Sequence, residues 1–228
     1  RGVAICTLTF DINSQPPMGI DIPRPLLIFP CNGNGIEALS CLGKNYRFLG
    51  FVDDNRDKQG TDVHGYSVSD RSVLLDSPTA QVLAVPGSPS SYPIRRQVIE
   101  GLNVELNRFA TVIHPSASIS PLARIGRNVL IMAGAVITSN AVIGDHVCIL
   151  PNTVIHHDAV VGAWSLLGSN ITIAGGTVVG ENCYIGSGTS VMNGLLIGDG
   201  ALVGLGSTVI HSVPAGSRIA GNPARLIG

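Results

Sequence analysis

The sequence predicts a small α/β domain with a Rossmann-like parallel sheet, followed by a left-handed parallel β-helix of hexapeptide repeats. Two observations predict this order. Apolar strand patterns alternate with turn and helix patterns between residues 25 and 110, and an aliphatic residue recurs every six positions from Ile113 onward. A third observation agrees with them: only 4% of the residues are aromatic, and the narrow core of a β-helix has little room for rings.

The six-residue period defines the second unit, which we place at residues 111–228. Every residue in the series is Ile, Val or Leu, and no insertion interrupts it. The series is Ile113, Ile119, Ile125, Ile131, Ile137, Ile143, Ile149, Ile155, Val161, Leu167, Ile173, Val179, Ile185, Val191, Ile197, Val203 and Val209. Three such hexads make one triangular coil of about 18 residues, whose interior the aliphatic side chains fill. Because each coil buries its surface only against its neighbours, stability is propagated along the stack.

A second inward position follows each aliphatic residue by four. It carries mostly small side chains, as at Ala135, Thr153 and Ser165, which fit beside the corners of a triangular coil. Gly and Asn recur between the hexads, as at Gly134 and Asn152, and they tolerate the positive φ that tight corners demand. Both features agree with a β-helix.

Residues 25–110 lack this period and predict the α/β domain. We expect strands at residues 25–29, 46–55, 81–85 and 108–114, and helices at residues 36–43 and 90–102. Such alternation favours a parallel sheet, in which ligands bind beyond the carboxyl ends of the strands. Residues 1–24 show only a weak pattern, and we expect them to be an N-terminal extension.

Two groups of residues fall on the expected ligand-binding rim of this sheet. Gly33, Asn34 and Gly35 belong to a glycine-rich turn after the first strand, and Asp53 and Asp54 end the second. Backbone N–H groups of such a turn can bind phosphate, although a plain βα turn would have the same pattern. The two carboxylates fit ribose or sugar hydroxyls, and they fit a solvated turn as well.

Composition argues against several classes of function. The net charge is −1, without a basic cluster, so we expect neither nucleic acid nor an anionic membrane surface as a partner. No run of about 18 apolar residues predicts a membrane span. The five cysteines lack paired spacing, which favours reduced thiols and a cytoplasmic location.

Residues 155–160, Ile-His-His-Asp-Ala-Val, concentrate titratable side chains within the β-helix. His157 comes two residues after Ile155, which places it outward at a corner, with Asp158 beside it. An outward histidine is usually inert, so a catalytic pair and a surface turn both remain open on this pattern. The histidines do not repeat at coil spacing and no Cys/His cluster has ligand spacing, so we expect no metal site.

Three runs in the β-helix carry a resemblance to a known family. They are IHPSASISPLARIG at residues 113–126, VIHHDAVVG at residues 154–162 and PAGSRIAGNPARLIG at residues 214–228. With the α/β domain before them, they resemble the bacterial sugar acetyltransferases, and more narrowly the sialic-acid O-acetyltransferases and nucleotide-aminosugar N-acetyltransferases (PglD/NeuD type). The resemblance covers about residues 25–228.

The resemblance implies an acetyl-CoA-dependent transfer of an acetyl group to a sugar, often to the amine of a nucleotide-linked 4-amino sugar. It implies that residues 25–110 bind the nucleotide sugar, and that the protein is a homotrimer with sites between its subunits. His157 matches the general base of the family, and Asp158 matches the acidic neighbour that orients it. Histidine suits this role because it exchanges a proton near neutral pH.

The resemblance also implies contacts to acetyl-CoA. The run Ala174, Gly175 and Gly176 matches the segment that supplies a backbone N–H to the tetrahedral oxyanion, with Gly175 as the candidate donor. Gly175 follows His157 by 18 residues, and this spacing independently places both on one edge of the β-helix. Residues 220–225 resemble the segment at the adenine and phosphate end of the cofactor. Asn222 and Arg225 are therefore candidate contacts, although Arg225 also fits a solvated terminal residue.

The sequence departs from the family pattern near the expected acceptor and thioester. Residues 30–35 lack the first glycine and the histidine of the glycine-rich turn, and Leu166 replaces a second histidine that is associated with the cofactor. Trp164 is unusual here and would either stack on a ligand or cover the seam of a trimer. A sialic-acid-type O-acetyltransferase, an acyltransferase for a non-sugar amine, and a non-catalytic β-helix assembly module therefore remain alternatives.

Overall fold

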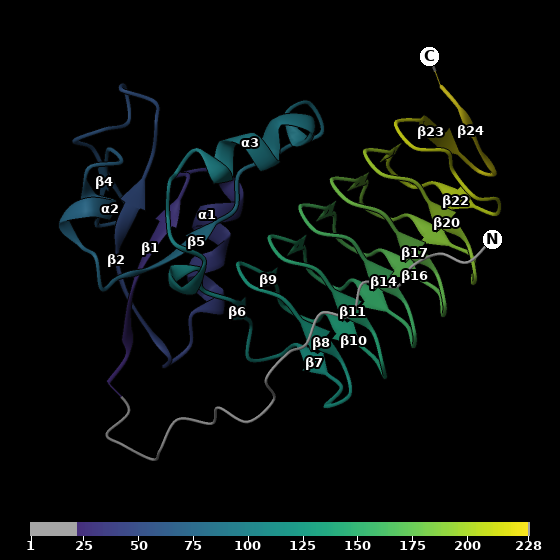
Figure 1. Cartoon of the computed structure of the whole chain (residues 1–228), viewed down its shortest axis with the longest axis horizontal. Helices are drawn as coiled ribbons and strands as arrows, with labels where there is room; N and C mark the ends of the chain where they lie inside the picture. Colours follow the sequence, from purple (N-terminus) through teal and green to yellow (C-terminus); the bar gives the residue numbers. More distant parts are fainter. Residues whose placement is uncertain (1–21, 228) are drawn as a thin grey trace.

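In the computed structural model, which describes residues 22–227, a small sheet domain stands against one face of a long β-helix (Figure 1). We call residues 24–110 the head and residues 112–226 the β-helix. The expected N-terminal extension lies almost entirely outside the described residues, and the first strand begins at Arg24. The predicted fold class, an α/β domain before a left-handed β-helix, is confirmed.

The head contains a five-stranded sheet in the order β3-β4-β2-β1-β5. All neighbouring strands are parallel except β3, which pairs antiparallel with β4 at the edge. The strands are β1 (Arg24–Phe29), β2 (Tyr46–Val52), β3 (Asp62–Val63), β4 (Tyr66–Ser69) and β5 (Gln81–Ala84). The short hairpin of β3 and β4 was not predicted, because two strands of this length carry no apolar period.

Short helices connect the strands of the head. They are α1 (Gly33–Glu37), η1 (Ala38–Cys41), α2 (Val73–Asp76), η2 (Tyr92–Ile94), α3 (Arg95–Glu100) and η3 (Leu106–Arg108). The first predicted helix, at residues 36–43, was placed too late. It begins at Gly33 because Asn32 caps it: the Asn32 side-chain oxygen accepts the Gly35 N–H at 2.9 Å, which satisfies a donor that no helical carbonyl can reach. The strand predicted at residues 108–114 is also shorter and forms only at β6 (Val112–Ile113).

The β-helix consists of three sheets of short strands, which have two residues each from β6 to β22. The first contains β6, β9 (Leu130–Ile131), β12 (Cys148–Ile149), β15 (Leu166–Leu167), β18 (Tyr184–Ile185), β21 (Leu202–Val203), β23 (Arg218–Gly221) and β24 (Ala224–Leu226). The second contains β7 (Ser118–Ile119), β10 (Val136–Ile137), β13 (Val154–Ile155), β16 (Thr172–Ile173), β19 (Ser190–Val191) and β22 (Thr208–Val209). The third contains β8 (Arg124–Ile125), β11 (Val142–Ile143), β14 (Val160–Val161), β17 (Val178–Val179) and β20 (Leu196–Ile197).

The predicted aliphatic series fills the interior of this triangle. Ile155, Ile173 and Val179 are fully buried and belong to one continuous core. Neighbouring coils pair in parallel at 18-residue register, as Ile137 does with Ile155. The series is less well buried in the first coil, where Ile113 is 37% exposed and Ile119 and Ile125 are partly buried.

Polar residues at the second inward position are satisfied inside the core. The Thr153 hydroxyl donates to the Gly168 carbonyl at 2.8 Å, and the Ser165 hydroxyl donates to the Gly180 carbonyl at 2.9 Å. Both residues are fully buried. Because each hydroxyl has a carbonyl partner, burial costs little, and a small polar residue can replace alanine beside the corner.

The head covers the outer face of the first sheet. Leu130, Cys148 and Leu166 point outward from that sheet, and they are buried in a second core cluster together with Ala38 and Cys41 of the head. This contact fixes where the head stands relative to the coils. The outer faces of the second and third sheets are not covered by the head in Figure 1.

Hydrogen bonds and stacking join the head to the corners of the β-helix. The guanidinium of Arg95, on α3, is buried and donates to the carbonyls of Pro86, His146 and Trp164. His146 stacks on Trp164 with ring centroids 3.9 Å apart. The Asn128 amide bonds both backbone groups of Ala84 on β5, at 2.7 and 2.8 Å. We call these four residues, Arg95, Asn128, His146 and Trp164, the junction.

The first prediction concerns Arg95. Replacing it by Met should lower the free energy of unfolding by about 3 kcal/mol, because the buried carbonyls of Pro86 and His146 and the partly buried carbonyl of Trp164 lose their donor. The measurement is urea denaturation followed by circular dichroism. Arg96→Met is the matched control: Arg96 is 57% exposed in its pair with Glu100, so its loss should cost less than about 1 kcal/mol. Equal effects of the two changes would contradict a special role for Arg95.

The second prediction concerns pH. Burial lowers the pKa of His146 from 6.5 to about 4, so between these values the unfolded chain binds a proton that the folded chain does not. The free energy of unfolding should therefore fall as the pH drops below 6.5, with His146 contributing about 2 kcal/mol between pH 7 and pH 5.

The control for this effect is His146→Asn, because asparagine tolerates the positive φ of 63° at this corner. The variant should be less stable than the wild type at pH 7 but should lose less stability on acidification. Denaturation curves at pH 7 and pH 5 give both differences. Parallel losses in the two proteins would contradict the assignment.

Candidate active site

His157 and Asp158 occupy a corner between β13 and β14. Asp158 has a φ of 59°, a conformation that aspartate tolerates better than most residues. His157 Nδ1 lies 2.8 Å from Asp158 Oδ2, and the two side chains are 65% and 56% exposed. The hydrogen bond with His157, and after it the one with Asn140, lowers the pKa of the Asp158 carboxyl. The predicted pair is therefore formed, with the acid oriented toward the ring.

Gly175 lies against the imidazole of His157, one coil further along the same edge. A Cβ atom at Gly175 would approach His157 Cε1 and Nε2 to 2.7 Å, which no side chain can do without displacing the ring. The next residue, Gly176, donates its N–H to the His157 carbonyl at 2.9 Å. The structure thus brings His157, Gly175 and Gly176 together, with Ala174 before them in the chain.

This arrangement can accept a proton. When Nδ1 donates its hydrogen to Asp158, the lone pair of the imidazole lies on Nε2, the atom that faces Gly175. A ring held in that tautomer can act as a general base, and the carboxylate stabilises the imidazolium that forms.

Asn140 is a member of the site that the sequence analysis missed. Its side-chain N–H donates to Asp158 Oδ1 at 3.0 Å. Asn140 precedes Asp158 by 18 residues and occupies the same corner one coil earlier, with a φ of 60°. The coil spacing that linked His157 to Gly175 would have found Asn140 if it had been applied toward the N-terminus.

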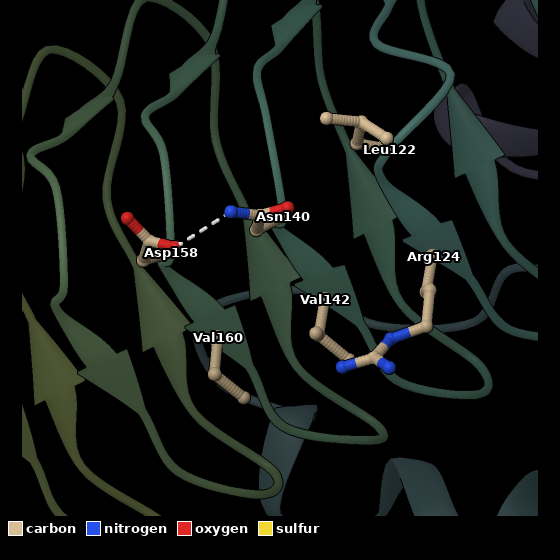
Figure 2. Close-up of a pocket in the computed structure, with 6 residues that line it drawn as sticks. All are labelled: Leu122, Arg124, Asn140, Val142, Asp158 and Val160. Carbon is tan, nitrogen blue, oxygen red and sulfur yellow. Dashed lines mark hydrogen bonds between the residues drawn. The ribbon is translucent and has the colours of Figure 1, made fainter.

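A groove of about 390 Å³ runs beside this corner, over the outer face of the third sheet. It is lined by Leu122, Arg124, Asn140, Val142, Asp158 and Val160, which Figure 2 shows as two rows along neighbouring coils. The bond between Asn140 and Asp158 closes one side of it, and the guanidinium of Arg124 extends across Val142 on the other. The groove therefore offers polar groups at both margins and an apolar floor.

The glycine-rich turn of the head is a capped helix start. Gly33 and Asn34 lie in the first turn of α1, and the Asn34 amide reaches the Val85 carbonyl at 3.4 Å. A Cβ at Gly35 would meet the Pro30 carbonyl oxygen at 2.3 Å. This close approach to Pro30 explains the glycine at position 35 without any ligand. Gly33 is exposed and has open space beside it.

The two predicted carboxylates lie beside this turn and are already engaged. Asp53 is buried, accepts the Cys31 N–H at 3.0 Å and pairs with Lys58 at 3.1 Å. Asp54 is half exposed and forms two hydrogen bonds with Arg71, at 2.6 and 2.7 Å. The predicted common rim is thus present, and Asp53 ties the two strand ends together.

Asn222 and Arg225 lie in the exposed hairpin of β23 and β24 at the far end of the β-helix. Arg225 donates to the neighbouring Ala224 carbonyl at 2.9 Å. Counted along the first sheet, this hairpin is three to four strands beyond the coil of His157. At the usual strand spacing that is roughly 15–20 Å, so these two residues cannot touch the same atoms of a ligand as His157 does.

Trp164 and Leu166 both lie where the head meets the β-helix. Trp164 lies at the junction, where it stacks on His146 and contacts the guanidinium of Arg96 at 5.5 Å. Leu166 is 4% exposed and packs against the head. Both positions support the contact between the head and the β-helix.

The two cysteines of the β-helix, Cys148 and Cys183, are buried away from this corner. Burial raises the pKa of Cys148 to about 12 and that of Cys183 to about 11. Cys148 faces the head and Cys183 fills the interior of the β-helix. Both therefore remain thiols at neutral pH and cannot serve as nucleophiles.

Within residues 22–227, no three His, Cys, Asp or Glu side chains come together as a metal-binding group. In the same part of the chain, no helix has both the length and the apolar character needed to cross a bilayer.

Comparison with solved structures identifies the fold. The acetyltransferase domain of PglB from Neisseria gonorrhoeae, solved with acetyl coenzyme A, superposes with a TM-score of 0.79 and 28% identity over 90% of this chain and 100% of that one. PerB from Caulobacter crescentus, solved with CoA and GDP-perosamine, gives 0.78 and 27% over 91% and 98%. The fold is that of the sugar N-acetyltransferases. The predicted resemblance is confirmed, and with it the enzyme class of acyltransferase.

Other comparisons are less specific. WeeI from Acinetobacter baumannii superposes with a TM-score of 0.77 at 24% identity, over 90% of this chain and 100% of that one, and shows the same fold. The family model of the GMPPB C-terminal domain matches residues 108–193, most of which lie in the β-helix. No curated protein matches the sequence.

The third prediction concerns Gly175. Gly175→Ala should displace the His157 ring and break its contact with Asp158, because the new methyl group would overlap Cε1 and Nε2. A crystal structure of the variant would show the ring position directly. The melting temperature should change by only a few degrees, since Gly175 has no positive φ that an alanine would strain. An unmoved ring would contradict the close approach.

Proposed function

We propose that this protein transfers the acetyl group of acetyl-CoA to the amine of a nucleotide-linked amino sugar, with His157 as general base. The observation that carries the proposal is the corner itself, where His157, Asp158 and Gly175 meet. Two structural relatives above 25% identity support it, because one holds acetyl-CoA and the other holds CoA with GDP-perosamine. The perosamine N-acetyltransferase of Caulobacter crescentus has also been solved with a single histidine replaced by Asn or Ala.

The proposed reaction is a direct transfer. The sugar amine attacks the thioester carbonyl while His157 Nε2 takes its proton, so that a C–N bond forms and an oxyanion develops on the carbonyl. The C–S bond then breaks, and the CoA thiolate takes the proton back from the imidazolium. No acyl-enzyme is involved, in agreement with the buried state of Cys148 and Cys183.

Gly175 would stabilise the oxyanion through its backbone N–H. Glycine at this position lets the thioester approach the edge of the β-helix, where a side chain would collide with His157. A donor aimed at the developing charge is worth about 3 kcal/mol in comparable enzymes. Ala174 and Gly176 would line the same stretch of the cofactor.

The cofactor would extend from Gly175 along the edge toward the C-terminal coils. Asn222 and Arg225 would meet its phosphate and adenine end, and an extended CoA could bridge the distance of roughly 15–20 Å set by the strand spacing. Arg225 suits a phosphate because its guanidinium keeps its charge and can donate two parallel hydrogen bonds.

The acceptor would lie between the corner of His157 in one subunit and the head of a neighbouring subunit, because the head of the same chain covers the first sheet and this corner joins the second and third. Gly33, Asn34 and Gly35 would face its nucleotide from the start of α1. Asp53 and Asp54 would contribute near the same rim. Asp54 is the better candidate for a hydroxyl, because Asp53 is buried in its bonds with Cys31 and Lys58.

A homotrimer would complete this site. His157 and Asp158 are more than half exposed in the single chain, which leaves the proposed reaction open to water. Along the third sheet the outward residues Val142, Val160, Val178 and Leu196 form an apolar row, and Val178 and Leu196 are exposed. A neighbouring subunit would bury that row and enclose the corner. Acetyl-CoA as donor and free thiols at four cysteines fit a cytoplasmic enzyme.

The fourth prediction is the test of this proposal. Thiol release from acetyl-CoA should depend on one member of a panel of UDP-, GDP- and dTDP-linked 4-amino sugars. His157→Ala should lower kcat by at least about 100-fold, the range of general base catalysis, while binding of acetyl-CoA by calorimetry stays unchanged.

The controls separate the alternatives. Free sialic acid in the same panel tests for O-acetylation, and His156→Ala tests whether the effect belongs to His157, because His156 makes no bond to Asp158 in the described part of the chain. Full activity of His157→Ala would contradict the base assignment. Bound acetyl-CoA without turnover on any acceptor would contradict the proposed reaction and favour a non-catalytic β-helix.

A further inference from the structure

We propose that Asn140 is a positioning residue, which holds the Asp158 carboxylate in the one orientation that sets the His157 ring for proton transfer. The inference rests on the proposed function, since it concerns the same base. It adds Asn140, which lies one coil before Asp158 and outside the sequence motif at residues 154–162.

The contacts form a chain of three side chains. Asn140 donates to Oδ1 of Asp158 at 3.0 Å, and Oδ2 of the same carboxylate lies 2.8 Å from Nδ1 of His157. Each carboxylate oxygen therefore has its own partner. Rotation of the carboxylate would break both bonds at once, so Asn140 restrains Asp158, and Asp158 restrains the ring. Figure 2 shows the Asn140 amide pointing at Asp158 along the wall of the groove.

This restraint matters because the pair is exposed. With side chains 65% and 56% accessible, His157 and Asp158 are not held by close packing, and an exposed ion pair alone fixes geometry poorly. A donor from the neighbouring coil supplies a fixed point, because the backbone of Asn140 is held by the parallel pairing of β11 with β14.

The chemistry of asparagine fits this position. Its backbone has a φ of 60°, where Asn and Gly are favoured. Glycine would provide the corner without the amide, and aspartate would provide the shape with the wrong charge. Only the amide combines the corner conformation with an N–H donor that stays neutral. Its hydrogen bond also helps to lower the pKa of Asp158, after the larger effect of His157, so the acid stays ionised as a partner for an imidazolium.

The fifth prediction compares two variants of this residue. Asn140→Gly removes the donor and Asn140→Asp replaces it by a carboxylate of the same shape, which repels Asp158. Each should lower kcat about tenfold, as expected for losing a hydrogen bond to a charged group, and should leave the KM for acetyl-CoA within about twofold. In Asn140→Asp the acid limb of the kcat/KM profile should also move to higher pH, because the added negative charge favours the protonated ring.

Asn170→Asp is the matched control. Asn170 has the same left-handed corner conformation, with a φ of 55°, it is exposed, and its side chain forms no hydrogen bond with residues 22–227. The control should keep the wild-type kcat and the wild-type pH profile. A loss of kcat shared by Asn170→Asp would assign the effect to the corner conformation and would overturn the inference.

A measurement without substrate separates this inference from the proposed function. Selective ¹⁵N labelling of histidine, with His157→Gln to assign its signals, reports which ring nitrogen carries the hydrogen. In the wild type Nδ1 of His157 should carry it, and in both Asn140 variants the two tautomers should become more evenly populated. An unchanged tautomer with unchanged kcat would overturn the role of Asn140. An altered tautomer in a protein without acetyl transfer would support it while contradicting the proposed reaction.

Discussion

The parallel stacking of coils at 18-residue register is the constraint on which the rest of this structure depends. Each coil contributes two-residue strands to three sheets, and each strand pairs with the equivalent strand one coil away. From β6 to β22 the register does not shift, so a residue at a corner lies over the residue 18 positions before it; only the last coil is shorter, since Leu202 pairs with Arg218. Two columns of residues on one edge follow from this geometry alone. One column contains Asn140, Asp158 and Gly176, and the other contains His157 and Gly175. They place the Asn140 donor, the Asp158 carboxylate, the His157 ring and the closely packed Gly175 next to one another.

The three outer faces of the β-helix differ in what covers them, and this difference distinguishes the face that binds the head from the faces beside the proposed site. The head buries the outer face of the first sheet through Leu130, Cys148 and Leu166. The third sheet keeps an apolar row next to the corner of His157 and Asp158, and the groove lies over its first coils, beginning at Arg124. The junction at Arg95, Asn128 and His146 fixes the head against this face, and η2 extends the contact to later coils, where the Tyr92 hydroxyl donates to the Gly200 carbonyl at 3.0 Å. In the proposed site the cofactor would lie C-terminal to His157.

Only 13% of the residues are charged, and the charged side chains discussed above fall into a buried and an exposed group. Arg95 and Asp53 are buried and hold backbone segments of different elements together, through carbonyls in one case and through Cys31 and Lys58 in the other. His157 and Asp158 are exposed and hold only each other and Asn140. The two buried charges join segments of the fold, whereas the exposed pair is accessible to solvent and to a ligand.

The sequence by itself determined the β-helix, the nature of the head and the meeting of His157, Asp158 and Gly175. A strict local period specifies the coil, and the coil specifies which residues share an edge, so no long-range information is needed. Tertiary structure decided the contacts outside the period, which are the junction of His146 with Trp164, the bonds of Asp53 and the hydrogen bond from the Asn140 side chain to Asp158. These depend on side-chain orientation and on packing between a repetitive and a non-repetitive part, which sequence spacing does not encode.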